Sequence, residues 1–127
     1  GNMGYCSDIG ISLLKKDFLS LQKQAEVKLD KCAYTNFCIL LQNARIQQSS
    51  GRISLTSLET EQFVSLVLEN EKWYTDSLPE ISFIHKFLYE LQAPKDYIEI
   101  GEDFEHNVVH FCDIGKINLI RKIDFAE

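Results

Sequence analysis

Apolar residues recur with the period of a helix between Ser77 and Leu91, and the pattern of this stretch is the clearest in the chain. Ser77 and Glu80 have the spacing of a capping box, in which two side chains bond free N–H groups of the first turn. Pro79 also suits a first turn. The apolar stripe that follows consists of Ile81, Ile84, Leu88 and Leu91. The pattern predicts a helix over residues 78–92, stopped by Pro94 because proline has no N–H to donate.

Strand-like runs of β-branched and aromatic residues follow this helix. The runs are Tyr97–Ile100, Val108–Cys112 and Asn118–Phe125. Turns are predicted between them, over 101–107 and 113–116, where glycine and short polar residues gather. One helix packed on an antiparallel meander is the expected result. Basic residues in the middle of 118–125 indicate an edge strand, and two copies of the chain can form a homodimer through such an edge.

The beginning of the chain predicts a strand and then a helix. Ile9, Ile11 and Leu13 alternate with small or polar residues, which is typical of a half-buried strand over Asp8–Leu14. An amphipathic helix follows, because apolar residues then recur three to four positions apart. Its stripe is Phe18, Leu21, Ala25 and Leu29.

Four middle segments have less distinct patterns. The apolar run within Lys31–Asn43 fits a helix or a buried strand, and its neighbours favour the helix. Polar residues ending in glycine predict a loop over Gln47–Gly51. Arg52–Leu58 is predicted as a short strand or an extended connector. Glu61–Tyr74 fits a helix or one long strand, and its β-branched and aromatic content favours the strand.

The chain length of 127 residues suits one domain spanning 1–127. A hydrophobic content of 45% and a charged content of 25% are typical of a globular protein. We therefore predict a single α+β domain with a mostly antiparallel sheet of about four to six strands and two or three helices. Gly1-Asn2 before Met3 is typical of residues added during cloning, and translation is expected to begin at Met3.

The formal net charge of −6 disfavours direct binding to nucleic acid or to anionic membranes, since both need a basic surface. No apolar run approaches the roughly 18 to 20 residues of a membrane helix, and no signal-peptide pattern opens the chain. The cysteines do not form short-spaced pairs, so reduced thiols in a cytoplasmic protein are expected. These cysteines are Cys6, Cys32, Cys38 and Cys112.

Two groups of residues are candidates for a partner-binding surface. Glu99, Glu102, Asp103 and Glu105 form an acidic cluster at a predicted turn. Solvated surface is the favoured reading, and the alternatives are a docking patch for a basic partner or a partial mimic of nucleic-acid phosphates. Trp73 and Tyr74 precede the predicted helix, and both residue types are enriched at binding hot spots. Large aromatic residues also fill cores, and the core reading is favoured for this pair.

A metal site is the alternative candidate. His106, His110 and Cys112 share one face if the segment is a regular strand, and all three are residue types that bind transition metals. The competing reading is a solvated hairpin with ordinary strand residues, because metal sites usually draw ligands from several elements.

The order of elements resembles a type of small uncharacterised protein found in phages and mobile elements of bacteria. The resemblance is carried by Asp8–Leu13, Lys72–Tyr74, helix 78–92, Ile98–Asp103 and Arg121–Phe125. It covers about two thirds of the chain and brings no catalytic residues or cofactors. It implies an accessory protein, in a class that includes inhibitors of host enzymes and defence systems.

The sequence therefore predicts a non-enzymatic protein-interaction module without a cofactor, acting through an acidic and partly aromatic surface on a basic-surfaced protein partner. The alternative is a small metal-binding protein or metal-dependent hydrolase that uses His106, His110 and neighbouring acids. A ligand-sensing domain with an apolar pocket between sheet and helices is a third reading, for which the sequence offers no evidence.

Overall fold

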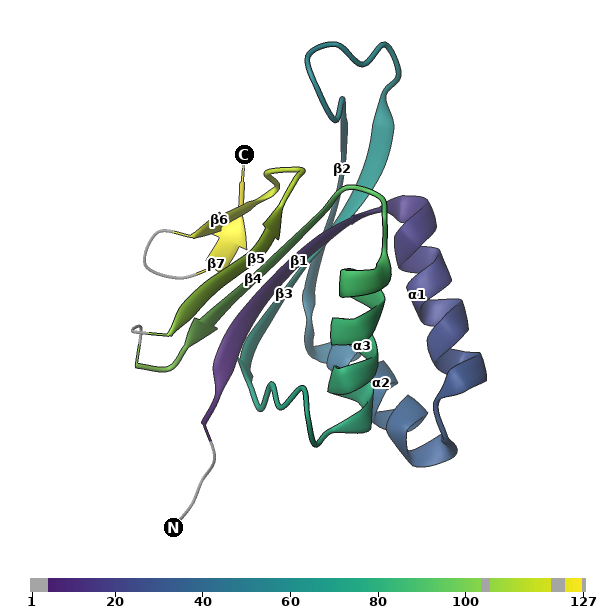
Figure 1. The fold of residues 1–127 in the computed structure, drawn as a ribbon, viewed down its shortest axis with the longest axis vertical. Coiled ribbons are helices and arrows are strands. Elements are labelled where there is room, and N and C mark those ends of the chain that lie inside the picture. The colour runs from purple at the N-terminus through teal and green to yellow at the C-terminus, as the bar shows by residue number, and fades with distance from the viewer. Residues whose placement is uncertain (1–4, 104–105, 120–122, 127) are drawn as a thin grey trace.

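A computed structural model describes residues 5–103, 106–119 and 123–126. Within them the chain forms a five-stranded antiparallel sheet of order β2-β3-β1-β4-β5 and a separate two-stranded hairpin, β6-β7. Three helices cover one face of the sheet (Figure 1). The elements are β1 (Ser7–Leu14), α1 (Lys15–Lys28), α2 (Lys31–Asn43), β2 (Arg45–Gly51), β3 (Glu61–Glu71), α3 (Pro79–Glu90), β4 (Lys95–Gly101), β5 (Asn107–Cys112), β6 (Ile117–Leu119) and β7 (Ile123–Phe125). The predicted α+β domain is confirmed.

The main core lies between the sheet and the helices. Central strand β1 sends Ile9, Ile11 and Leu13 toward the helices, and each of these side chains is almost fully buried. Their alternation is that of a strand with one face on the core. Leu88 of α3 and Leu21 of α1 pack against the same cluster, so the predicted apolar stripes of both helices face the sheet.

A smaller core lies on the opposite face, where the β6-β7 hairpin packs. Val67, Ile98 and Ile100 of the sheet form a buried cluster with Ile117 and Ile123 of the hairpin. Alternating residues of β3 and β4 therefore serve two cores. The sheet is covered on both faces near β1, which explains why β1 has almost no exposed position.

Several uncertain assignments are decided by the structure. The segment Lys31–Asn43 is a helix, begun by Asp30, whose carboxylate accepts the N–H of Ala33 at 2.8 Å. The segment after residue 60 is the long strand β3. Both assignments agree with the prediction favoured for each segment. Within the described part of the chain, no helix is long and apolar enough to cross a membrane.

The predicted loop over Gln47–Gly51 is wrong, because Arg45–Gly51 is strand β2. It pairs with β3 without a bulge and forms one edge of the sheet. Its side chains are mostly exposed. Polar side chains are tolerated in a strand that is held by backbone hydrogen bonds. The segment after Gly51 forms the loop at the tip of the projecting hairpin (Figure 1).

The predicted single strand over 118–125 is also wrong. Its described residues belong to two short strands, β6 and β7, that pair with each other on a face of the sheet. Arg121 and Lys122 lie outside the described residues. The described edges of the main sheet are β2 and β5, whereas β6 and β7 pair only with each other; the homodimer through an edge at 118–125 stays a prediction.

The capping box predicted from Ser77 and Glu80 does not form. Helix α3 has Leu78 as its N-cap, without a side-chain hydrogen bond. Ser77 instead belongs to the preceding turn, in which the N–H groups of Ser77 and Leu78 both bond the carbonyl of Tyr74. Glu80 is left in the first turn of α3 without the reciprocal partner that the motif supplies.

Candidate functional site

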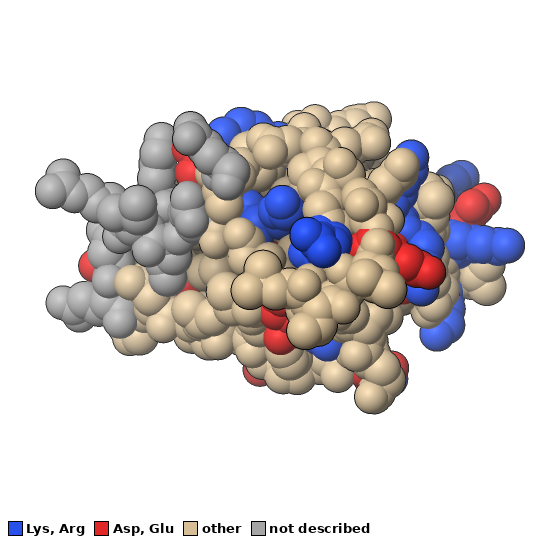
Figure 2. Space-filling model, turned by 90° about the horizontal axis from the view of Figure 1, so that it is seen from above, with Lys and Arg blue, Asp and Glu red and all other residues tan. Residues whose placement is uncertain are grey.

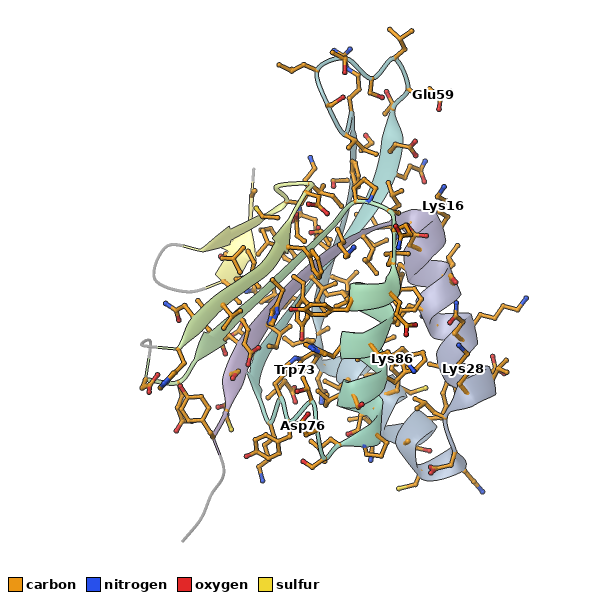
Figure 3. All side chains as sticks on the ribbon, viewed as in Figure 1. Lys16, Lys28, Glu59, Trp73, Asp76 and Lys86 are labelled. Atoms are coloured by element: carbon orange, nitrogen blue, oxygen red, sulfur yellow. The ribbon has the colours of Figure 1, made fainter. Side chains whose placement is uncertain are left out.

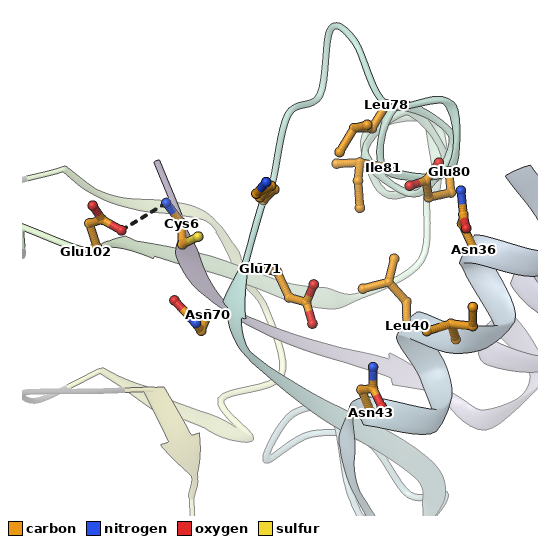
Figure 4. A pocket seen from close by; sticks show the side chains of 12 residues that line it. Cys6, Asn36, Leu40, Asn43, Asn70, Glu71, Leu78, Glu80, Ile81 and Glu102 are labelled. Carbon is orange, nitrogen blue, oxygen red and sulfur yellow. Dashed lines mark hydrogen bonds between the residues drawn. The ribbon is translucent and has the colours of Figure 1, made fainter. Parts of the chain in front are cut away.

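Polar residues gather at the end of the sheet where β1 begins and where β3 and β4 finish. A pocket of about 620 Å³ opens there between this end of the sheet, α2 and the start of α3 (Figure 4). We call it the acidic pocket, because three carboxylates line it with a single lysine. Its polar side chains are Glu71, Glu80, Glu102, Lys72, Asn36, Asn43, Asn70 and Cys6.

Glu80 is the most unusual residue of the acidic pocket. It is only 7% exposed, and its Oε1 atom is buried without a hydrogen-bond partner. Glu80 lies on the α3 side of the pocket, while Glu71 lies on the β3 side (Figure 4). A buried carboxylate oxygen without a partner costs free energy unless another group binds it. The pocket therefore holds an unused acceptor.

Glu71 adds a second carboxylate in partly buried surroundings. Burial raises the pKa of the Glu71 carboxyl above its ordinary value, because removal from water disfavours the charged form. A cation placed in the pocket would act in the opposite direction and favour the ionised carboxylate. A positively charged group in the pocket would thus meet one buried carboxylate, Glu80, and one partly buried carboxylate, Glu71.

The acidic turn predicted from the sequence adjoins this pocket. Glu102 lines it and accepts the backbone N–H of Cys6 at 3.1 Å. Asp103 accepts a hydrogen bond from the Tyr5 hydroxyl at 2.6 Å, and this bond raises the pKa of Tyr5. The other carboxylate oxygen of Asp103 lies 3.0 Å from Nδ1 of His106. Glu105 lies outside the described residues. These contacts tie the turn to the chain segment that begins β1.

Trp73 departs from the predicted binding surface. Its side chain is 5% exposed, and its indole N–H donates to the Tyr97 hydroxyl at 2.7 Å. The chain folds over the sheet after β3, so the indole is enclosed beneath α3 in the main core. This agrees with the favoured prediction for Trp73. Tyr74, the next residue, keeps partial exposure. Of the predicted aromatic pair, Tyr74 alone remains accessible to a partner.

The predicted metal ligands do not converge. His106 sits at the acidic turn, whereas His110 faces Glu99 and Tyr89 on the helix side of the sheet. A β-bulge causes this separation, because Tyr97 pairs with Phe111 but Ile98 pairs with Val109, so His110 is the extra residue. Cys112 pairs with Asp96, one position beyond Phe111, and so points to the other face. Among the described residues, no group of three or more His, Cys, Asp or Glu side chains is arranged to hold a metal.

A second polar group, which the sequence did not indicate, lies between α3 and the β4-β5 hairpin. We call it the tyrosine–histidine cluster, and it consists of His85, Tyr89, Tyr97, Glu99 and His110. Tyr97 is fully buried at its centre, with its hydroxyl 2.9 Å from Nδ1 of His85. Burial raises the pKa of Tyr97 and lowers that of His85, and the charge of a protonated His110 would lower the latter further.

Part of this cluster follows from spacing. His85 and Tyr89 are four residues apart on a helix, and Tyr97 and Glu99 alternate on one strand face. A helix–strand pairing of these faces brings the four residues together. His110 was unpredictable, because the bulge that turns it toward them depends on strand register.

The chain gives no match in comparisons with protein-family models, curated proteins and solved structures. The fold and the site define a single α+β domain with an antiparallel sheet, three helices on one face and an acidic pocket at one end.

Proposed function

We propose that this protein is a non-enzymatic protein-interaction module whose acidic pocket receives a basic side chain of a partner protein. The observation that carries the proposal is the unpartnered Oε1 of Glu80, buried in a pocket that two further carboxylates line. A lysine or arginine side chain supplies both the positive charge and the N–H donors that this oxygen lacks.

The lining of the acidic pocket matches the whole length of such a side chain. Leu40, Leu78 and Ile81 line it alongside the acids. Lysine and arginine bury their methylene stems along apolar surface while the charged head seeks polar partners. The asparagine side chains add carbonyl oxygens, which accept the remaining donors of a guanidinium. Arginine fits best, because its planar head reaches several acceptors at once.

The charge distribution supports the same partner. The pocket carries three carboxylates against Lys72, and Asp103 follows the lining residue Glu102 in the chain. The face seen from above in Figure 2, at the other end of the molecule, displays Lys and Arg side chains together with Asp and Glu side chains. The carboxylates of the pocket would favour the approach of a basic partner surface. The wider form of the proposal is a phage or mobile-element inhibitor of a host enzyme or defence system.

A titration with capped arginine tests the pocket directly. The probe is N-acetyl-arginine amide, and N-acetyl-citrulline amide is its uncharged match. Backbone amide shifts measured by NMR should move around the pocket with the arginine probe and stay unchanged with citrulline. Glu80→Gln should weaken binding at least tenfold, because truncating one member of a buried charge pair costs about 2 kcal/mol or more.

Glu59→Gln is the matched control. Glu59 is exposed at the tip of the β2-β3 hairpin, at the opposite end of the molecule from Trp73 and Asp76 (Figure 3). This variant changes the net charge as Glu80→Gln does but should bind the probe like the parent protein. Equal binding of the arginine and citrulline probes, or equal weakening by both variants, would refute the proposal.

A further inference from the structure

Tyr89, His110 and Glu99 form a hydrogen-bonded relay that the proposed partner binding does not use. The Tyr89 hydroxyl lies 2.5 Å from Nδ1 of His110, and Nε2 of the same ring lies 3.2 Å from Oε1 of Glu99. An ionised carboxylate can only accept hydrogen bonds, so it holds the ring proton on Nε2. Nδ1 is then an acceptor, and the Tyr89 hydroxyl donates its proton to it.

The imidazole is held firmly in this orientation. The rings of His110 and Tyr97 stack at 4.1 Å between centroids with a 17° angle between planes. Tyr97 is itself fully buried and bonded through its hydroxyl to Trp73 and to His85. The groups that face the imidazole are thus Glu99 and Tyr97 from β4 and the side chains of His85 and Tyr89 from α3.

Exposure differs along the relay in the way that a reactive group requires. Tyr89 is 49% exposed, whereas the side chains of His110 and Glu99 are only 11% and 24% exposed. A reagent in solution can therefore reach the phenol, while the base and the carboxylate behind it stay sheltered. A sheltered base with a fixed tautomer is what general-base activation of a hydroxyl needs.

We propose that Tyr89 is a nucleophilic acyl-acceptor site, activated by His110 as the base and by Glu99 as the residue that positions it. The phenolic oxygen forms a bond to the carbonyl carbon of an activated acyl donor, and the bond from that carbon to the leaving group breaks. The phenolic proton passes to Nδ1 of His110, and the leaving group takes a proton from water. The carboxylate of Glu99 and the net charge of −6 favour a donor without a polyanionic phosphate chain.

Tyr5 provides an internal comparison. It is 38% exposed, so a reagent reaches it nearly as well as Tyr89. Its hydroxyl also lies close to a carboxylate and a histidine, Asp103 and His106. There, however, the same ring nitrogen, Nδ1 of His106, faces both the hydroxyl and the carboxylate. A proton cannot be passed through the ring from such an arrangement, so Tyr5 should react without activation by His106.

Acetylation by N-acetylimidazole tests the site. Peptide mass spectrometry after brief exposure at pH 7 should show acetylation of Tyr89 at least tenfold faster than that of Tyr5. This ratio is smaller than the rate acceleration that general-base catalysis usually contributes. The reaction joins the acetyl group to the phenolic oxygen and releases imidazole. His110→Gln should bring the rate at Tyr89 down to that at Tyr5, and Tyr89→Phe should remove the modified peptide.

A pH profile separates activation from mere accessibility. The ratio of the rate at Tyr89 to the rate at Tyr5 should change with pH in the parent protein and should stay constant in His110→Gln. The rate at Tyr5 should keep rising through the ordinary phenol pKa of about 10, because the hydrogen bond to Asp103 raises the pKa of Tyr5. If His110→Gln does not fold by circular dichroism, Glu99→Gln takes its place, with an expected several-fold loss at Tyr89 alone. Equal rates and parallel profiles at the two tyrosines would overturn the proposal.

Discussion

The indole N–H of Trp73 donates a hydrogen bond to the hydroxyl of Tyr97 at 2.7 Å, and both side chains are buried. This contact links the segment after β3 to strand β4 beneath α3. The same hydroxyl lies 2.9 Å from the His85 ring. One phenol oxygen thus holds three segments of the chain together, which makes it the most informative single atom for a test of the core.

Tyr97→Phe should destabilise the protein by about 1–3 kcal/mol, because the buried indole N–H of Trp73 loses its acceptor. The shape of the core is otherwise preserved. Urea unfolding followed by tryptophan fluorescence should show a lower midpoint with an unchanged slope. Tyr74→Phe, at a partly exposed neighbour of Trp73, serves as the control and should have little effect. A midpoint equal to that of the parent protein would show that the hydrogen bond does not contribute to stability.

Asp96 organises the turn that sends the chain from β5 to the hairpin on the opposite face. It is fully buried, and its carboxylate accepts the N–H groups of Ile114, Gly115 and Lys116 at 2.8 to 3.0 Å. Gly115 has a φ of +80°, a conformation that suits glycine.

Asp96→Ala should cost more than about 3 kcal/mol, because three charge-assisted hydrogen bonds are lost together. Asp96→Asn should cost less, since its amide oxygen still accepts. Thermal unfolding by calorimetry measures both, with the exposed Glu59→Ala as control. A similar loss for Asp96→Ala and Glu59→Ala would contradict this role for the carboxylate.

Gly10 lets the β6-β7 hairpin approach the centre of the sheet. A Cβ atom built at Gly10 would lie 2.6 Å from Cγ2 of Ile123 and 2.7 Å from Cγ2 of Ile117. Gly10→Ala should therefore destabilise the protein by about 1–3 kcal/mol through overpacking. Gly51→Ala meets no atom closer than 3.7 Å and should be nearly neutral. Chemical denaturation compares the two, and the Gly10→Ala penalty should shrink in an Ile123→Ala background.

Protonation of His85 should weaken the fold in mild acid. Burial and the neighbouring His110 lower the pKa of His85, with partial opposition from Glu99 and Asp76. The folded state therefore binds this proton less tightly than the unfolded chain. The stabilisation is present above the unfolded pKa of about 6.5 and is lost as the pH falls through the lowered folded pKa. Melting temperatures should fall between pH 7 and pH 5, and less so in His85→Gln. An identical pH dependence in this variant would exclude His85 as the cause.

Glu71 should have the opposite pH dependence. Because burial raises its pKa, the folded state holds this proton more tightly than the unfolded chain. Its contribution to stability is greatest below the unfolded pKa of about 4.3 and is lost as the pH rises through the raised folded pKa. Glu71→Gln should therefore raise the melting temperature at pH 7 and leave it unchanged at pH 4. The same variant should weaken binding of the arginine probe, so stability and binding should change in opposite directions.

The elements that sequence analysis placed well are those whose burial follows a simple period. The alternation of Ile9, Ile11 and Leu13 matches β1, and the helical stripe through Leu88 matches α3. The polar edge strand β2 was missed, because backbone pairing with β3 leaves no apolar pattern in its side chains. The capping box predicted at Ser77 does not form, because Ser77 belongs to the turn that precedes the helix.

The candidate site was only partly visible in the sequence. Glu102 and Asp103 were recognised as an acidic turn, and Glu102 lines the acidic pocket. Spacing predicts a helix-cap role for Glu80, and the pattern around Glu71 is that of an ordinary strand residue. Whether a carboxylate is solvated or buried depends on what the rest of the chain places over it, which spacing does not reveal.

By itself, the sequence determined the fold class and the order of most helices and strands, because burial of apolar residues with period 2 or 3.6 has few solutions. Tertiary structure alone decided where the ends of β1, β3 and α3 meet to form the acidic pocket. It also decided, through the bulge at His110, which ring faces Tyr89 and Glu99. Strand register and the closure of long loops bring these residues together, and both depend on contacts between positions far apart in the chain.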